Sequence, residues 1–168
     1  YESLLDNPDY TSVINERHWQ RLKGYIDDQE ARKVRIEVFN PTSESFDDPG
    51  KHKLPFVMPV EPDEDSLIMQ DEIFGPVAAL VSYSDEQEML SLANDVEHGL
   101  VGYVFTRDAA RGLRIAEALE TGMVGFNRGL VSDPSAPFGG VKASGIGREG
   151  GHDGLLAFLE TKYVAGNW

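Results

Sequence analysis

The 168-residue sequence contains no cysteine. That absence excludes disulfide bonds, thiolate metal ligands and a thiol nucleophile within this chain. Basic side chains are also scarce, because 15 lysines and arginines stand against 29 acidic residues and leave a formal net charge of −14. Since phosphate contacts need local cations, this balance disfavours DNA, RNA and anionic membranes as partners. No apolar run reaches the roughly 18 residues of a membrane-spanning helix.

The chain opens with Tyr1, without an initiator methionine, and shows neither the basic nor the apolar region of a signal peptide. This opening indicates either a trimmed chain or part of a larger polypeptide, and we expect a cytoplasmic location. What the sequence does contain is typical of a globular protein, with 40% hydrophobic and 26% charged residues. The length predicts about one domain.

Apolar residues at helical spacing predict an amphipathic helix over residues 14–33, followed by a strand over 34–39. Residues 42–53 are polar and rich in turn formers, which indicates an exposed loop. Residues 54–60 contain two prolines, which favours an edge strand or an irregular extended segment. The apolar face of the predicted helix comprises Trp19, Leu22, Tyr25 and Ile26.

The second half predicts strands over residues 77–83, 100–105 and 123–127 with a helix in each gap. We expect Ser84 and Gln87 to form a capping box at the first helix, and Thr106 or Asp108 to cap the second. The residues predicted to be buried are Met89, Leu92, Ala93 and Val96 in the first helix and Leu113, Ala116 and Leu119 in the second. This alternation predicts an α/β fold built from βαβ units with a mostly parallel sheet. A short helix over 153–159 and an extended tail over 161–165 close the chain.

Several motifs are only weak evidence for a binding or catalytic site. Residues 145–150 match G-x-G-x-x-G, but only 18 residues follow, too few for a dinucleotide-binding βαβ unit. The four histidines lie far apart in the sequence, so we predict no metal site. Ser132 and Ser135 lack the G-x-S-x-G context of a serine hydrolase.

Two other stretches are more specific. Residues 69–77 read M-Q-D-E-I-F-G-P-V, and residues 132–145 read S-D-P-S-A-P-F-G-G-V-K-A-S-G. With G-M-V-G-F-N at 122–127 and Y-V-F-T-R-D at 103–108, this ordered set closely resembles the C-terminal third of the NAD(P)-dependent aldehyde dehydrogenase superfamily. Residues 127–134 and the ending look most like succinate-semialdehyde dehydrogenases, whereas the first 60 residues look closer to coniferyl-aldehyde dehydrogenases.

The resemblance implies oxidation of an aldehyde to a carboxylate, through attack by a cysteine thiolate, hydride transfer to NAD or NADP and hydrolysis of a thioester by water that a glutamate activates. It places both catalytic residues and the cofactor domain upstream of this sequence. We therefore expect residues 1–160 to be the C-terminal part of the catalytic domain, with no catalytic residue in this chain, and we expect the chain alone to be inactive. The alternative is a non-catalytic oligomerisation or interaction module derived from that family.

The resemblance also implies roles for four residues. Glu72 matches the glutamate that accepts hydrogen bonds from the nicotinamide-ribose hydroxyls, and Phe74 matches the aromatic residue beside that ribose. Ser132 occupies the position that holds the distal carboxylate of succinate semialdehyde, and Phe138 matches an aromatic residue of the aldehyde funnel. Residues 161–168 resemble an oligomerisation strand and tail, which implies a homodimer or homotetramer.

Overall fold

In the computed structural model, which describes residues 2–167, the chain forms two units, Tyr1–Ser82 and Tyr83–Trp168. The sequence contained no signal for a division at this point. The first unit contains α1 (Glu16–Ala31), β1 (Arg35–Phe39), the 3₁₀ turn η1 (Pro49–Lys51), β2 (Phe56–Val60) and α2 (Leu67–Gln70). The second contains α3 (Glu86–Asn94), β3 (His98–Gly99), β4 (Val101–Val104), α4 (Ala109–Ala118), β5 (Met123–Phe126), β6 (Val141–Lys142) and α5 (Gly151–Leu156).

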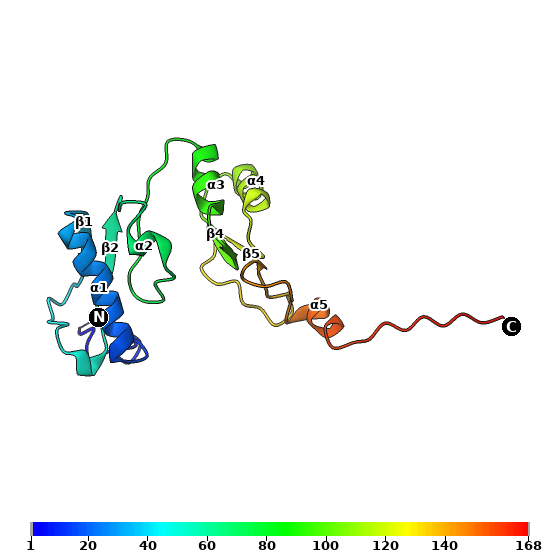
Figure 1. Cartoon of the computed structure of the whole chain (residues 1–168), viewed down its shortest axis with the longest axis horizontal. Coiled ribbons are helices and arrows are strands. Elements are labelled where there is room, and N and C mark those ends of the chain that lie inside the picture. Colours follow the sequence, from blue (N-terminus) through cyan, green and yellow to red (C-terminus); the bar gives the residue numbers. More distant parts are fainter. Residues whose placement is uncertain (1, 168) are drawn as a thin grey trace. The chain divides into compact units, whose positions relative to one another are not determined.

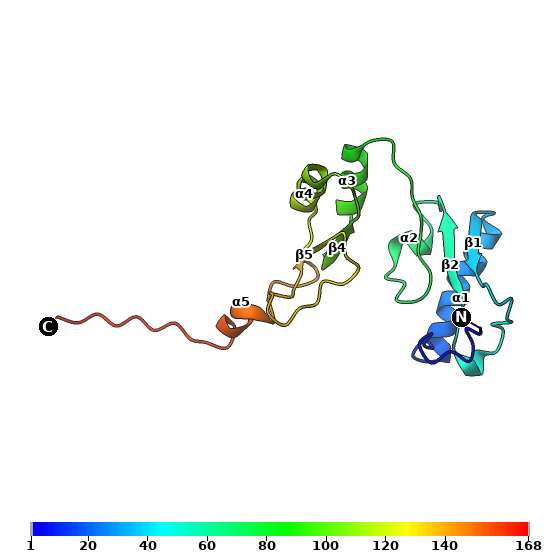
Figure 2. The ribbon, with the colours of Figure 1, turned by 180° about the vertical axis from the view of Figure 1, so that it is seen from behind.

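Helix α1 confirms the first predicted element and supplies one side of the core (Figure 1). Asn15 caps its N-terminus by accepting a hydrogen bond from the His18 amide at 2.9 Å. The buried core cluster joins α1 to β2, α2 and the segment after α2, and it comprises Trp19, Leu22, Tyr25, Leu54, Val57, Ile68 and Val77. Figure 2 shows the same arrangement of α1, β1 and β2 from behind.

Strands β1 and β2 pair antiparallel, with Arg35 opposite Val60 and Phe39 opposite Phe56. The predicted strand over residues 77–83 is replaced by two isolated parallel bridges to β2, at Val77 and Leu80. The reason lies in Pro59, which has no N–H to donate between the amides of Val57 and Glu61, which do donate to this segment. A continuous third strand therefore does not form there.

The second unit contains the parallel βαβ arrangement that the sequence predicts, because β4 and β5 pair parallel and α4 connects them. The remaining pair, β3 with β6, is antiparallel. Of the three two-stranded sheets within residues 2–167, two are antiparallel, so the prediction of a mostly parallel sheet is wrong. A parallel pair needs a crossover connection, and in the described residues only β4 and β5 are consecutive paired strands with a helix between them.

The predicted buried faces of the two helices in the second unit are confirmed only in part, because Met89, Ala116 and Leu119 are half-buried and the other predicted residues are exposed. Leu92 and Val96 are 44% and 53% exposed, and the apolar side of α3 borders a surface cavity of about 490 Å³. In α4 the buried positions are Gly112 and Ile115, whereas Leu113 is 58% exposed. Helical spacing gives a periodicity, but contact with Phe126 of β5 selects which face of α4 packs inward.

The N-cap of α3 is Asp85, one residue later than the predicted Ser84. Asp85 accepts a hydrogen bond from the Glu88 amide at 2.9 Å, and the Glu88 carboxylate accepts one from the Ser84 amide at 2.7 Å. Asp108 caps α4 by accepting from the Arg111 amide. After α5 the described chain continues to residue 167 without regular secondary structure (Figure 1). The predicted tail reaches Trp168, which lies outside the described residues.

Within residues 2–167 no helix is long and apolar enough to cross a membrane.

Candidate functional site

The first candidate site is the segment that follows α2 and carries Glu72 and Phe74. Both residues are exposed, and the Phe74 side chain is 78% accessible. Within residues 2–167 the Glu72 carboxylate takes part in no hydrogen bond or ion pair, and only the backbone carbonyl of Glu72 accepts hydrogen bonds. The segment therefore presents an acceptor-only group and an aromatic ring two residues apart to the surface.

Arg21 of α1 binds the backbone of this segment. Its two terminal nitrogens donate to the Glu72 carbonyl at 3.1 and 3.2 Å, and Nη2 also donates to the Ile73 carbonyl at 2.7 Å. Nη1 donates to the Tyr25 hydroxyl at 2.9 Å, and the guanidinium carbon lies 5.4 Å from the centre of the Tyr25 ring. The planar guanidinium offers five donors in a fixed geometry, which suits several acceptors at once.

His18 and Tyr25 contact the residues on either side of the two that Arg21 binds, Phe74 and Asp71 respectively. His18 Nε2 lies 2.7 Å from the Phe74 carbonyl, and His18 Nδ1 accepts from Arg21 Nε at 3.3 Å. The Tyr25 hydroxyl donates to the Asp71 carboxylate at 2.7 Å. Burial, followed by the Asp71 hydrogen bond, raises the pKa of Tyr25 above its ordinary value, so this hydroxyl stays protonated and remains a donor.

Phe74 has an unusual backbone conformation, with φ of +56°. A bulky residue in this left-handed region is strained by about 1–3 kcal/mol and persists only where surrounding contacts hold it. Gly75 follows and lies against Leu22, because a Cβ built at Gly75 would stand 2.5 Å from Leu22 Cδ1. Glycine is thus required here for close approach to α1.

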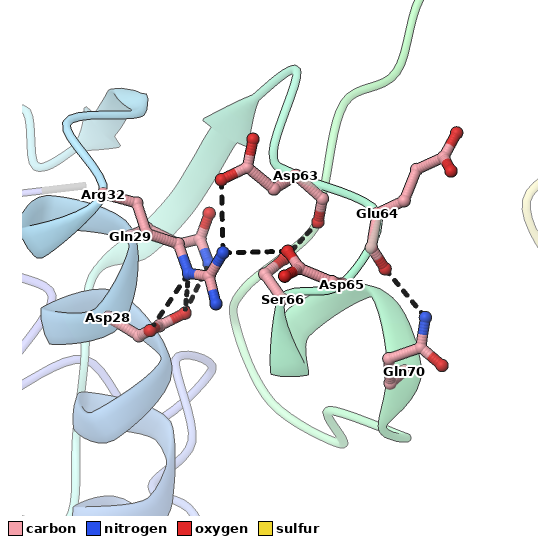
Figure 3. Close-up of polar contacts among 8 residues, drawn as sticks. All are labelled: Asp28, Gln29, Arg32, Asp63, Glu64, Asp65, Ser66 and Gln70. Atoms are coloured by element: carbon pink, nitrogen blue, oxygen red, sulfur yellow. Dashed lines mark hydrogen bonds and ion pairs between the residues drawn. The ribbon is translucent and has the colours of Figure 1, made fainter.

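A polar network holds the other end of α2 to α1 (Figure 3). Arg32, next to the C-terminus of α1, pairs with Asp28 at 3.1 Å, Asp63 at 3.2 Å and Asp65 at 2.9 Å. Ser66 is fully buried and donates to the Asp63 carbonyl at 2.6 Å. Since the residues before and after α2 are both bound to α1, this four-residue helix is fixed at both ends.

A surface cavity of about 430 Å³ lies beside Phe74. It is lined by residues 9–14, His18 and residues 74–76.

The second candidate site is the loop between β5 and β6, which carries Ser132 and Phe138. Ser132 is exposed, and Phe138 is half-buried, with its backbone paired to Glu149. Asp133 accepts hydrogen bonds from the Ser135 hydroxyl at 2.7 Å and the Ser135 amide at 2.9 Å. These bonds, with a smaller contribution from the Arg128 charge, lower the pKa of Asp133, so Ser132 stands next to a permanently ionised carboxylate at neutral pH.

Close backbone approach shapes the rest of this loop. A Cβ at Gly122 would collide with the backbone of Gly139 and Gly140, so the loop lies directly against the start of β5. Lys142 Nζ donates to the carbonyl of Asn94 at 2.7 Å and that of Val96 at 3.2 Å, which ties the loop to the end of α3.

The four residues singled out from the sequence thus form two pairs. Glu72 and Phe74 lie on one segment of the first unit, and Ser132 and Phe138 lie on one loop of the second. Their roles remain predictions. The roles of Arg21 and His18 were not predicted, because their acceptors lie about fifty residues further along the chain. The one signal for them in the sequence is a pair of polar residues at i and i+3 beside an apolar helix face. Among residues 2–167 no group of three acidic or histidine side chains is placed to hold a metal ion.

Known proteins are similar to this chain over almost its whole length. The profile of the aldehyde dehydrogenase family matches residues 2–164. The chain is 48% identical over 118 residues to the succinate-semialdehyde dehydrogenase of Paenarthrobacter nicotinovorans, which covers 70% of this chain and 26% of that protein. It is 35% identical over 166 residues to the probable coniferyl aldehyde dehydrogenase of Caulobacter vibrioides, covering 98% of this chain and 34% of that protein.

The structure also matches solved structures. The Mycobacterium tuberculosis aldehyde dehydrogenase complexed with NAD⁺ superposes with a TM-score of 0.76 at 32% identity, over 92% of this chain and 33% of that one. The chain therefore spans between about a quarter and a third of the length of these relatives.

Proposed function

Because this chain belongs to the aldehyde dehydrogenase family, we propose that it supplies part of the cofactor and aldehyde sites of an NAD(P)⁺-dependent enzyme that oxidises an aldehyde to its carboxylate. The observation that carries this proposal is the segment after α2, where a carboxylate with no partner among residues 2–167 and an exposed aromatic ring lie two residues apart on a backbone held by α1. Succinate semialdehyde is the proposed substrate.

The residues present suit a nicotinamide ribose. The Glu72 carboxylate can accept hydrogen bonds from both ribose hydroxyls, which fixes the orientation of the attached ring. The Phe74 ring, exposed on the same segment, can pack beside the sugar. When bound, the nicotinamide supplies the acceptor for a hydride. NAD and NADP share this ribose, so either cofactor fits the segment.

The nucleophile of the proposed reaction must come from outside these 168 residues, because the sequence contains no cysteine. We propose the same origin for the general-base glutamate and the cofactor domain of the parent enzyme. The competing proposal is a non-catalytic module used for oligomerisation. The intact mass of the natural protein separates the two, since an enzyme parent is several times longer and contains the cysteine.

For the substrate, the proposal rests on the Ser132 hydroxyl as a hydrogen-bond donor to a distal carboxylate. A hydrogen bond to a charged group contributes about 1.5–3 kcal/mol, or roughly ten- to a hundredfold in affinity. The ionised Asp133 beside it opposes an anion. Cations elsewhere in the parent enzyme must therefore supply the rest of the attraction.

The test is Ser132→Ala in a chimera in which this chain replaces the matching segment of the Paenarthrobacter nicotinovorans enzyme. We expect KM for succinate semialdehyde to rise at least about tenfold, with little change for an uncharged aldehyde such as propanal. Ser135→Ala is the matched control, because its hydroxyl is already bound by Asp133. Equal effects of Ser132→Ala on both aldehydes would refute the substrate assignment.

The tail after α5 is proposed to pair with a neighbouring subunit. Its apolar side chains are exposed, with Tyr163 88% and Val164 77% accessible. A backbone segment without pairing partners readily adds to the sheet of another chain.

A further inference from the structure

We propose that one face of α1 is a positioning device for the cofactor, in which Arg21, supported by His18 and Tyr25, holds the backbone carbonyls of residues 72–74. The proposal rests on the function proposed above for Glu72 and Phe74. These three helix residues lie at positions i, i+3 and i+7, so they share one side of α1. None of them is needed to contact the cofactor itself.

The contacts form one connected chain across the segment. Arg21 Nε donates to His18 Nδ1, which leaves the proton of the neutral imidazole on Nε2, where it donates to the Phe74 carbonyl. The terminal nitrogens of Arg21 hold the carbonyls of Glu72 and Ile73. Three consecutive carbonyls are thereby fixed from the same helix.

The hydrogen bonds from Arg21 and His18 go to backbone carbonyls, so they do not occupy the side chains of Glu72 and Phe74. The Glu72 carboxylate has no partner among residues 2–167, although its carbonyl accepts two hydrogen bonds. Phe74 keeps its strained left-handed backbone and an exposed ring. Since α2 has only four residues and no side-chain cap at Ser66, the segment has little local structure of its own. External contacts must therefore hold its conformation.

The first measurement uses the 168-residue chain without any cofactor. Backbone ¹⁵N order parameters at residues 72–75 should be near 0.85 in the unchanged protein and should fall below about 0.6 in Arg21→Ala. Arg21→Lys should give an intermediate value, because an ammonium retains the charge and some donors but not the planar fork. Arg17→Ala is the matched control, since it removes the same charge from an exposed position of the same helix.

The second measurement uses the chimera and separates this proposal from the one on which it rests. Glu72→Ala and Arg21→Ala should each raise KM for the cofactor about tenfold or more, the loss expected for one hydrogen bond to a charged group. Arg21→Ala added to Glu72→Ala should raise KM by less than the two single changes combined, because the carboxylate that Arg21 positions is already missing and only the effect on Phe74 remains. Arg17→Ala should leave KM unchanged.

The outcomes are distinct. No effect of Glu72→Ala on the cofactor KM refutes the proposed function of that residue. An effect of Glu72→Ala with unchanged order parameters in Arg21→Ala, or with fully additive changes in the double variant, refutes the positioning role. If Arg21→Ala cannot be purified, the order parameters and the cofactor KM of Arg21→Lys are compared with those of Arg17→Ala instead.

Discussion

At the scale of single residues, the chemistry depends on small contacts between α1 and the segment carrying Glu72. Gly75 illustrates this, because its missing side chain leaves room for Leu22, which is fully buried. A methyl group there would collide with both Leu22 methyls, at 2.5 and 2.7 Å. Packing at this point therefore sets how closely the segment approaches the helix.

We expect Gly75→Ala to lower the free energy of unfolding by about 1–3 kcal/mol through overpacking, and Leu22→Ala to lower it by about 2–5 kcal/mol through a cavity. The double variant should lose less than the sum, because the new methyl enters the vacated space. Urea unfolding followed by Trp19 fluorescence in a Trp168→Phe background measures all three. Additivity within about 0.5 kcal/mol would contradict the contact.

Glu44 connects the N-terminal residues to the loop before η1. Its carboxylate accepts from the Ser3 and Thr42 hydroxyls, both at 2.5 Å, and from the Leu4 amide at 2.6 Å. Hydrogen bonds, that of Ser3 first, lower the pKa of Glu44 from 4.5 to about 2. Because the folded pKa is depressed, the stabilisation is complete above about pH 4.5 and is lost as the pH falls toward 2.

The prediction is that Glu44→Gln lowers the urea midpoint at pH 7 and that this difference from the unchanged protein shrinks between pH 4.5 and 2. Asp47→Asn, which removes a carboxylate from the same loop, is the comparison variant. A difference independent of pH over this range would show that the charge of Glu44 does not contribute.

At the scale of elements, α1, β4, α4 and β5 form where the local signals predict them, whereas the strand predicted after Pro76 does not form. Apolar residues favour an extended conformation over residues 77–83, but Pro59 interrupts the ladder along β2. Helix α3 likewise forms from its own cap and spacing, yet its apolar side borders a cavity. An element can thus form where predicted while its partners differ.

The tail after α5 provides the prediction at this scale. In the chimera, Tyr163→Asp combined with Val164→Asp should reduce the assembly to a smaller oligomer or a monomer, because charges at these exposed positions block strand pairing and burial. Light scattering coupled to size-exclusion chromatography measures the mass. Lys162→Asp, at the neighbouring position of the same tail, is the control, and an unchanged mass in the double variant would refute the proposed role.

At the scale of the whole molecule, the chain belongs to an enzyme family but carries no thiol. We expect the purified 168-residue chain to form no NADH or NADPH from succinate semialdehyde with either cofactor, because the proposed reaction requires a cysteine nucleophile. The absorbance of the reduced cofactor measures this, with the chimera as the positive control. Turnover by the chain alone would contradict the proposal that the catalytic nucleophile lies outside these 168 residues.

The sequence by itself determined the family, the order of most elements, the absence of thiol chemistry and the segments that carry Glu72 and Ser132. These features are local, because motifs and periodicity need only neighbouring residues. The tertiary structure alone decided which helix faces are buried, which strands pair, and that Arg21 and His18 bind the carbonyls of residues 72–74. Those contacts join residues about fifty positions apart. Their acceptors are backbone carbonyls, which every residue has, so the pattern of side chains along the sequence cannot identify them.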